Sequence, residues 1–378
     1  MKFRCERDDL LGAVQFASRA ISTRATLPVL AGLRIEALEG GRVRVAATDL
    51  ELTMETAFTA AVDEPGKTIV PGRLFGEVTR SLAAGQVSVA GTEGEVEIGS
   101  GRGQFRVKAL APDDYPSLPI EDEAASDSVI EATLDAETLA NALSQVVRAA
   151  STDESRQILT GVLWELSETS VTLAATDSYR LGVRTLPIEG GPAELRQVVL
   201  PARALGELAR ALGNGATSVK ALVKENLVSF TLSGGSEPGL DNALIGSRFI
   251  EGEFPKYRQL LPEGYQNALT VEKDALLDVT KRVGLLAQNN LPLKLRLGSE
   301  LEISAHTPDV GEGQEVLDAS FDGESLVIAF NPQFLYDGVS AVRSEEVVVQ
   351  VGDGLKPAII QAKDDSTFTY LLMPVRLS

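Results

Sequence analysis

Residues 70–82 read VPGRLFGEVTRSL, and residues 200–212 read LPARALGELARAL. A weaker copy, FNPQFLYDGVSAV, fills residues 330–342, so the three segments start at intervals of 130 residues. A second marker agrees, because AATD ends at Asp49 and again at Asp177, while SAHT ends at Thr307. Repeated units joined by a constant rotation form an arc, and an arc can close. Function should therefore be sought first in the shape that three copies build.

Each copy is predicted to run helix, strands, helix, strands. Segments such as RVRVAATD and LELTMETAF alternate apolar and polar residues, which is typical of half-buried strands. Strands that follow one another directly favour an α+β fold with antiparallel sheets. The predicted helices are a first one around Leu10 to Ser18, then Pro71–Leu82, Asp135–Ala150, Ala202–Leu212, Lys273–Gln288 and Pro332–Arg343.

Composition sets the domain count and the class of protein. A chain of 378 residues is too long for one ordinary core, and a third of it has the usual size of a domain. The acidic stretch Glu121–Ser128 and a break at Pro262–Asn267 predict domains at 1–125, 126–264 and 265–378. With 44% hydrophobic and 24% charged residues and no long apolar segment, a soluble cytoplasmic protein without membrane contact is expected.

Residues for ordinary catalysis are scarce. The chain has one cysteine, Cys5, and one histidine, His306, which is expected at an exposed strand end rather than in a triad. Gly66-Lys67-Thr68 lacks the rest of a phosphate-binding loop and is interpreted as a turn. We therefore predict no catalytic residue, no metal and no cofactor. Carboxylate-dependent metal hydrolysis that uses His306 and nearby acids is the enzymatic alternative.

Arginines recur at equivalent positions of the repeated helix. Arg73 and Arg80 are seven residues apart, as are Arg203 and Arg210, and seven residues are close to two helical turns. A solvated helix face inherited by duplication would explain one such pair, whereas recurrence favours a shared task. Further basic residues lie in or beside the other repeated helices, namely Arg24, Arg148, Lys281, Arg282 and Arg343.

Net charge is −19, yet a sum does not say where charges lie. If the helices turn toward a common axis, these basic residues would line it inside an acidic shell. Such a lining contacts phosphates without reading bases, which allows sliding on duplex nucleic acid.

The apolar end of the chain, Leu371–Leu377, suggests a second site. It is either a buried last strand or an adaptable Met- and Pro-containing surface for varied peptides. The residues leave both alternatives open.

Several motifs together resemble the bacterial DNA polymerase III β subunit family of sliding clamps, over essentially the whole chain. They are MKF with ERDDLL at residues 1–11, TLPVL at residues 26–30, Ala175-Thr176-Asp177 with Arg180-Leu181, Phe254-Pro255 with Tyr257-Arg258, and Met373-Pro374-Val375-Arg376-Leu377. The resemblance implies three similar domains per chain, each with antiparallel sheets outside and two helices inside. It also implies that a homodimer closes a six-domain ring around double-stranded DNA.

The resemblance further implies partners and sites. The replicative polymerase catalytic subunit, the clamp loader, other polymerases and repair proteins would dock short peptides between the second and third domains. The peptide site would comprise Leu159, Thr176, Arg180, Leu181, Pro255, Leu260, Met373, Pro374, Val375, Arg376 and Leu377. The subunit contact would pair Val107 with Leu285 and Leu286, and the protein would be a non-catalytic processivity factor in the cytoplasm, at the nucleoid.

Some residues depart from the pattern. Gln333 and Ser340 stand where the first two copies have arginines, which predicts an uneven basic lining. Ser178 and Tyr179 occupy a variable rim of the peptide site, and Ser378 extends past the usual terminal leucine. A third class of protein, an adaptor that binds peptides but no DNA, would be indifferent to reversal of the repeated arginines.

Overall fold

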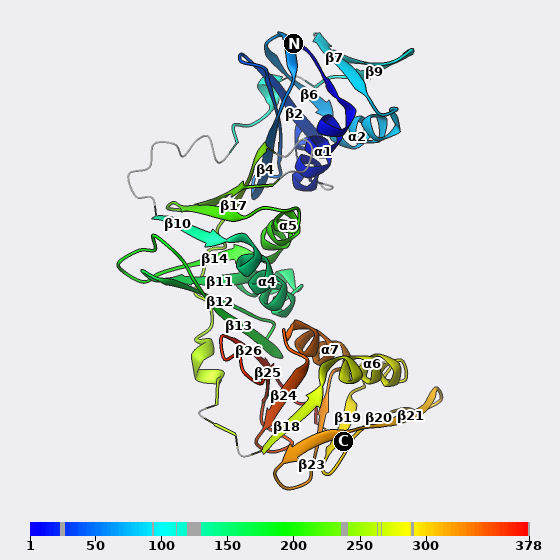
Figure 1. The fold of residues 1–378 in the computed structure, drawn as a ribbon, viewed down its shortest axis with the longest axis vertical. Coiled ribbons are helices and arrows are strands. Elements are labelled where there is room, and N and C mark those ends of the chain that lie inside the picture. The colour runs from blue at the N-terminus through cyan, green and yellow to red at the C-terminus, as the bar shows by residue number, and fades with distance from the viewer. Residues whose placement is uncertain are drawn as a thin grey trace. The chain divides into compact units, whose positions relative to one another are not determined.

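The computed structural model shows an α+β chain of antiparallel sheets and short helices (Figure 1). It describes residues 1–22, 27–92, 94–110, 112–118, 130–235, 241–262, 264–265, 267–288 and 291–376. The described residues form two compact units. Unit 1 comprises Met1–Ala140, Ile188–Ala193 and Arg203–Phe249, and unit 2 comprises Asn141–Pro187, Glu194–Ala202 and Ile250–Ser378. Each unit therefore holds one terminal repeat and part of the middle one. The domain ends expected at 125 and 264 stay a prediction.

Unit 1 contains two antiparallel sheets. The first has the strand order β5-β1-β7-β8-β9, and the second has the order β10-β15-β16-β17-β4-β3-β2-β6. The strands of the first are β1 (Lys2–Glu6), β5 (Ala61–Glu64), β7 (Gln86–Thr92), β8 (Glu95–Ser100) and β9 (Gly103–Lys108). Those of the second are β2 (Gly32–Leu38), β3 (Arg42–Thr48), β4 (Leu52–Thr59), β6 (Gly66–Pro71), β10 (Ile130–Asp135), β15 (Ser218–Val223), β16 (Leu227–Ser233) and β17 (Asp241–Arg248).

Unit 2 repeats this plan with sheets in the orders β14-β11-β12-β13-β26-β25-β24-β18-β22 and β21-β20-β19-β23. The first sheet comprises β11 (Gly161–Leu166), β12 (Ser170–Thr176), β13 (Arg180–Pro187), β14 (Arg196–Pro201), β18 (Asn267–Glu272), β22 (Ala319–Asp322), β24 (Glu346–Val351), β25 (Ala358–Ala362) and β26 (Phe368–Leu372). The second comprises β19 (Leu293–Leu297), β20 (Leu301–Thr307), β21 (Gly311–Leu317) and β23 (Leu326–Phe330).

Six α-helices lie close to the predicted positions: α1 (Arg7–Ala17), α2 (Gly72–Ser81), α4 (Ala136–Val146), α5 (Ala202–Leu212), α6 (Lys273–Gly284) and α7 (Pro332–Ala341). The 3₁₀ turns are η1 (Ser18–Ala20), η2 (Pro28–Ala31), η3 (Pro112–Asp114), η4 (Val147–Ala149), η5 (Glu154–Thr160) and η6 (Tyr257–Leu260). Among the described residues no helix is both long and apolar enough to cross a membrane.

Helices pack in pairs on the sheets of each terminal repeat. In unit 1, α1 lies on β3 and β4 and contacts α2, while in unit 2 α6 and α7 contact each other. Helix α7 comes close to β26, because a Cβ on Gly338 would lie 2.4 Å from the Tyr370 ring. The start of α7 is fixed by Asn331, whose side chain accepts hydrogen bonds from the backbone of Gln333 and Phe334.

The repeated Thr-Asp marker is a turn between strands. Thr48 Oγ1 donates to the Leu52 carbonyl at 3.0 Å, and Asp49 Oδ1 accepts from the Leu52 amide at 2.8 Å. Thr176 and Asp177 make the same bonds to Arg180, at 2.7 and 3.0 Å. The residue after each aspartate has a left-handed backbone, with φ of 80° at Leu50 and 82° at Ser178. Local chemistry thus reproduces the same turn in two copies.

Neighbouring repeats join edge to edge through their sheets. In unit 1, β4 of the first repeat pairs with β17 of the second, and in unit 2, β13 of the second pairs with β26 of the third. Figure 1 shows each of these two strand pairs lying side by side. We call these two junctions between repeats the first seam (β4–β17) and the second seam (β13–β26). At each seam the repeats share a continuous antiparallel sheet rather than a flexible linker.

Candidate functional site

The repeated arginines of α2 and α5 lie on exposed positions. Arg73 extends into solvent and pairs with Glu77 one turn along α2, at 3.1 Å. Arg80 is also exposed, and no ion pair with another described residue is found for it. An exposed pair of this kind contributes little to stability. Both α2 arginines therefore keep their charge available to a phosphate.

The α5 arginines are more engaged within unit 1. Arg203 is half exposed and forms a short ion pair with Asp49, and its other nitrogen lies 3.4 Å from the Arg19 carbonyl. Arg210 lies 3.6 Å from Glu207, which also pairs with Arg19 at 3.5 Å. Arg203 and Arg73 are equivalent in sequence, but Arg203 pairs with Asp49 of another repeat, whereas Arg73 pairs with Glu77 of its own helix.

In unit 2 the basic positions are arranged differently. Arg282 on α6 binds Glu315 through two nitrogens, at 2.9 and 2.7 Å, and this hydrogen bonding raises the pKa of the Arg282 guanidinium. Lys281 beside it is exposed. Arg148 of η4 donates to Ser340 Oγ at 2.7 Å, and Arg343 donates to Ser144 Oγ at 3.2 Å. Ser340 stands where the first two repeats have an arginine, and it accepts a hydrogen bond from Arg148 of the neighbouring repeat.

One predicted basic residue, Arg24, lies outside the described residues. His306 is second from the end of β20 and is exposed, with Nδ1 3.8 Å from the Glu312 carboxylate, as the sequence analysis expected.

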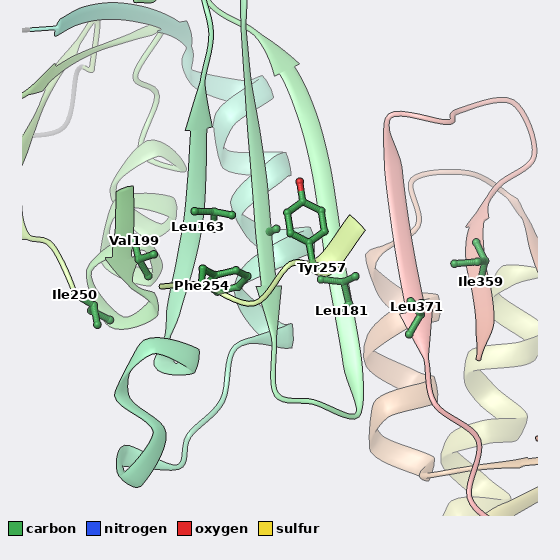
Figure 2. Packing of buried hydrophobic residues seen from close by; sticks show 9 residues of the cluster. Leu163, Leu181, Val199, Ile250, Phe254, Tyr257, Ile359 and Leu371 are labelled. Atoms are coloured by element: carbon green, nitrogen blue, oxygen red, sulfur yellow. The ribbon is translucent and has the colours of Figure 1, made fainter. Parts of the chain in front are cut away.

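The C-terminal segment is held at the seam between the second and third repeats. Leu371 of β26 stands opposite Leu181 of β13, and both side chains are buried in one apolar cluster. Figure 2 shows this cluster, which also includes Leu163, Ala174, Val199, Ile250, Phe254, Tyr257 and Ile359. Beyond β26 the Met373 amide donates to the Tyr179 carbonyl at 2.9 Å, and the Val375 amide donates to the Ala329 carbonyl at 2.8 Å. The buried-strand alternative is therefore realised over β26, whereas peptide binding at the tail stays a prediction.

Exposed apolar side chains neighbour these elements along the chain, with Tyr179 just before β13, Met373 just after β26 and Leu260 just before Leu261, which packs against the cluster. Tyr179, Leu260 and Met373 are exposed, with 62%, 52% and 38% of their surfaces accessible. We call these three residues, together with Leu181 and Leu371, the seam surface. Exposed large apolar side chains are typical of a protein-binding surface.

The other residues of the predicted peptide site take several positions. Leu159 and Thr176 are buried, and Pro255 and Arg376 are exposed. Pro374 and Val375 are partly buried, and Leu377 lies outside the described residues.

Arg180 closes the seam itself rather than extending into solvent. Its guanidinium binds Asp177 at 2.9 Å and Asp337 of α7 at 2.5 Å, and lies 4.2 Å from the centre of the Phe334 ring. Burial alone would lower the pKa of the Arg180 guanidinium, but Tyr370 and the two carboxylates raise it. Arg180 thus joins the β12–β13 turn to the helix of the next repeat.

Of the predicted subunit-contact residues, Val107 lies on an edge strand, and Leu285 and Leu286 follow α6. Val107 of β9 is buried within its own repeat, whereas Phe105 on the same strand is exposed. Strict alternation would place Phe105 on the same face as Val107, so no pattern in the sequence marked Phe105 as exposed. Leu285 is 72% exposed after α6, and Leu286 packs toward Gly313 of β21.

The sequence analysis also missed Glu165. It lies in the otherwise apolar strand GVLWEL and is buried, where its carboxylate binds Tyr257 and Arg258. A charge inside an apolar strand was the available signal, because buried charges require partners.

Comparison with known proteins identifies the family. Family models of the DNA polymerase III beta subunit match residues 1–119 with its N-terminal domain, 133–256 with its central domain and 258–376 with its C-terminal domain. The beta sliding clamp of Streptomyces coelicolor is 34% identical over 392 residues, covering all of both chains. That of Staphylococcus aureus is 32% identical, covering 100% of this chain and 99% of the relative.

Solved structures agree over the full length. The DNA polymerase sliding clamp of Bacillus subtilis superposes with a TM-score of 0.91 at 28% identity, covering 100% of both chains. A sliding clamp of Pseudomonas aeruginosa bound to griselimycin gives a TM-score of 0.90 at 25% identity, again with full coverage of both. The chain therefore belongs to the bacterial DNA polymerase III beta subunit family, the sliding clamps that serve as non-catalytic processivity subunits of a DNA polymerase.

Proposed function

We propose that two copies of this chain close head to tail around duplex DNA, and that replication and repair proteins dock on the seam surface. Ring closure is supported above all by the way repeats join inside the chain. Strands β4, β13 and β21 occupy equivalent places in the three repeats, as do β9, β17 and β26. Because β4 pairs with β17 and β13 with β26, a second copy would complete the series by pairing its β9 with β21.

The edge strands β9 and β21 carry opposite charges. Strand β9 carries Arg106 and Lys108, and β21 carries Glu312 and Glu315. Phe105 on one edge and Leu285 beside the other expose apolar surface. Opposite charge with central apolar contact is the usual composition of a specific interface. A ring would use each edge once per subunit, so the contact is head to tail and occurs twice.

DNA contact is assigned to the basic helical residues. Exposed Arg73, Arg80 and Lys281 would meet phosphates, with Arg24, Arg148, Arg203, Arg210 and Arg282 as further members. Such contacts are not sequence-specific and weaken with salt, which permits sliding. The acidic balance of −19 would limit adsorption of nucleic acid elsewhere. Tethering would raise the effective concentration of the primer end near the polymerase.

The seam surface is the proposed docking site for the polymerase, the clamp loader and repair proteins. Its exposed Tyr179, Leu260 and Met373 suit a short peptide with apolar anchors. The griselimycin complex of the Pseudomonas aeruginosa clamp supports the view that this fold accepts a ligand. The loader would open the ring, and the protein would act in the bacterial cytoplasm, at the nucleoid.

Retention on DNA tests topological linkage. Protein loaded on nicked circular DNA should remain bound in high salt and should be released after the circle is cut. A tether that encircles DNA escapes only over a free end, whereas ordinary phosphate contacts dissociate from either form. Equal escape from circular and linear DNA would refute the ring.

A further inference from the structure

A segment between the second and third repeats crosses one face of the nine-stranded sheet of unit 2. The Ile250 amide donates to the Val199 carbonyl at 2.8 Å on β14, and Tyr265 Oη donates to the Pro357 carbonyl at 2.8 Å beside β25. Between these ends, Phe254 and Tyr257 lie in the apolar cluster (Figure 2). The opposite face carries helical residues, because Gly182 lies against Val146.

This segment carries part of the proposed docking site. Pro255 and Leu260 are exposed on it, and the residue after Leu260, Leu261, packs against the apolar cluster. Its local turns are hydrogen bonded, since the Tyr257 amide donates to the Pro255 carbonyl at 2.7 Å and the Leu261 amide to the Arg258 carbonyl at 3.3 Å. The position of Tyr257 and Arg258 therefore fixes the positions of Pro255 and Leu260.

Glu165 holds Tyr257 and Arg258 in place. Tyr257 Oη donates to the Glu165 carboxylate at 2.6 Å, and Arg258 binds it with two nitrogens, at 2.7 and 2.6 Å. Gln197 on the neighbouring strand donates to the same carboxylate at 2.7 Å. The Glu165 side chain is only 2% exposed, whereas Arg258 is 61% exposed. We call these four residues the Glu165 clasp.

The hydrogen bonds of the Glu165 clasp fix the orientation of Tyr257 and Arg258, which apolar packing alone does not. Apolar burial holds the rings of Phe254 and Tyr257 but tolerates small shifts and rotations. Two-nitrogen binding of a carboxylate by arginine fixes both distance and orientation. The Arg258 guanidinium also lies 4.9 Å from the centre of the Tyr257 ring, which couples the two residues.

We infer that Glu165 is a positioning residue for partner binding, which fixes the segment carrying Pro255 and Leu260 and thereby places Leu260 in the seam surface. This inference rests on the proposed docking function of that surface. Glu165 itself would touch no partner, because its carboxylate is buried under Tyr257 and Arg258. Its effect on affinity would pass through Leu260, whose side chain is exposed.

The test uses the full-length protein and griselimycin, with the dissociation constant measured by calorimetry. Glu165→Gln keeps the size of the side chain but replaces one acceptor oxygen by a donor, which opposes Arg258 or Tyr257. We expect affinity to fall about tenfold, the lower end of the loss seen when a residue that supports a metal ligand is replaced. Tyr257→Phe removes one hydrogen bond and keeps the ring, so a smaller loss is expected.

The matched control is Asp365→Asn. Asp365 binds Arg184 at 2.7 Å on the same sheet and makes no contact with the clasp residues among the described interactions. The affinity of this variant should equal that of the wild type. Denaturant unfolding of every variant shows whether the protein is folded at the temperature of the titration.

A double-mutant cycle separates positioning from simple stabilisation. If Glu165 acts through Leu260, then Leu260→Ala should cost much less affinity in the Glu165→Gln protein than in the wild type. Additive losses, or a folded Glu165→Gln protein with wild-type affinity, would overturn the inference. If Glu165→Gln does not fold, the same cycle with Tyr257→Phe decides the question. Failure of the wild-type protein to bind griselimycin would instead overturn the docking function, and this inference with it.

Discussion

At the scale of single residues, an arginine of the second repeat forms an ion pair across each seam. At the first seam Arg203 of the second repeat binds Asp49 of the first. At the second seam Arg180 of the second repeat binds Asp177 beside it and Asp337 of the third. Asp49 and Asp177 are equivalent residues of the repeated turn, so the same turn supplies an acceptor to each arginine, while the bond across the second seam goes to Asp337.

Replacing Arg180 with methionine should destabilise unit 2 strongly. The change leaves the buried carboxylates of Asp177 and Asp337 without their shared cation, which costs about 3–5 kcal/mol. Chemical denaturation followed by circular dichroism would measure the loss. Arg156→Ala is the control, because Arg156 is exposed and its pair with Asp153 is worth under about 1 kcal/mol. Similar losses in both variants would contradict the assignment.

Charge removal at Arg80 should weaken DNA binding more than charge removal at Arg203. Arg80 has no ion pair among the described residues, whereas Arg203 is held by Asp49. Each lost phosphate contact lowers the slope of log affinity against log salt by about 0.9. Salt titrations of DNA binding by Arg80→Gln and Arg203→Gln would measure this. A larger change for Arg203→Gln would mean that the Asp49 pair opens on DNA.

Acid should destabilise the wild-type protein more than Glu165→Gln. Burial acts to raise the pKa of Glu165, but hydrogen bonds from Arg258, Tyr257 and Gln197 outweigh it and lower the pKa below the ordinary 4.5. A carboxyl group with a lowered folded-state pKa stabilises the protein above its unfolded-state pKa, and this stabilisation is lost as pH falls through the folded-state value. The free energy of unfolding, measured from pH 7 down past 4.5, should therefore fall more steeply for wild type. Parallel curves would contradict this prediction.

At the scale of elements, the strands rather than the helices join the repeats. The β4–β17 and β13–β26 pairs extend the sheets across both seams, while the tail after β26 adds backbone hydrogen bonds to Tyr179 and Ala329. The tail thus lies at the second seam without belonging to its sheet. Removing the tail should therefore affect ligand binding without unfolding the domain.

A chain truncated after Leu372 should stay folded and lose griselimycin binding. Strand β26 ends at Leu372, so its pairing with β13 and β25 is kept, while the exposed Met373 side chain is removed. Calorimetry would report binding, and thermal unfolding would report folding. Asp365→Asn, which changes a side chain between β25 and β26 outside the predicted peptide site, serves as the comparison. Wild-type affinity in the truncated chain would exclude Met373 and the residues after it from the seam surface.

At the scale of the whole molecule, unpaired strand edges are the feature that calls for a second copy. Both β9 and β21 end their sheets, and exposed edges tend to pair with other chains. Within one chain the equivalent strands are already paired at two seams. Closure by dimerisation would pair these two edges.

Phe105→Glu combined with Leu285→Glu should give a monomer. Light scattering should report about twice 40.1 kDa for the wild type and 40.1 kDa for the variant, because the new charges oppose an apolar contact. Leu355→Glu is the control, since Leu355 is 69% exposed and lies on neither edge. A wild-type protein of monomeric mass would end the ring proposal.

Local patterns in the sequence determined the repeat, the helices and the family. Helix α5 covers Ala202–Leu212 as predicted, and the Thr-Asp marker forms the same turn twice, because both depend on neighbours a few residues away. Longer helices were predicted too far at their ends, as α6 stops at Gly284 rather than at Gln288. Helix ends depend on packing as well as on pattern.

Only the tertiary structure decided which charges are free and which side chains are exposed. Arg203 and Asp49 are 154 residues apart in the chain, and Arg258 and Glu165 are 93 apart, yet each pair is in contact. Periodicity describes one element at a time, so it could not reveal that Arg203 is held while Arg73 extends into solvent. Ion pairs and burial depend on distant segments brought together by folding, and that is why the sites needed the structure.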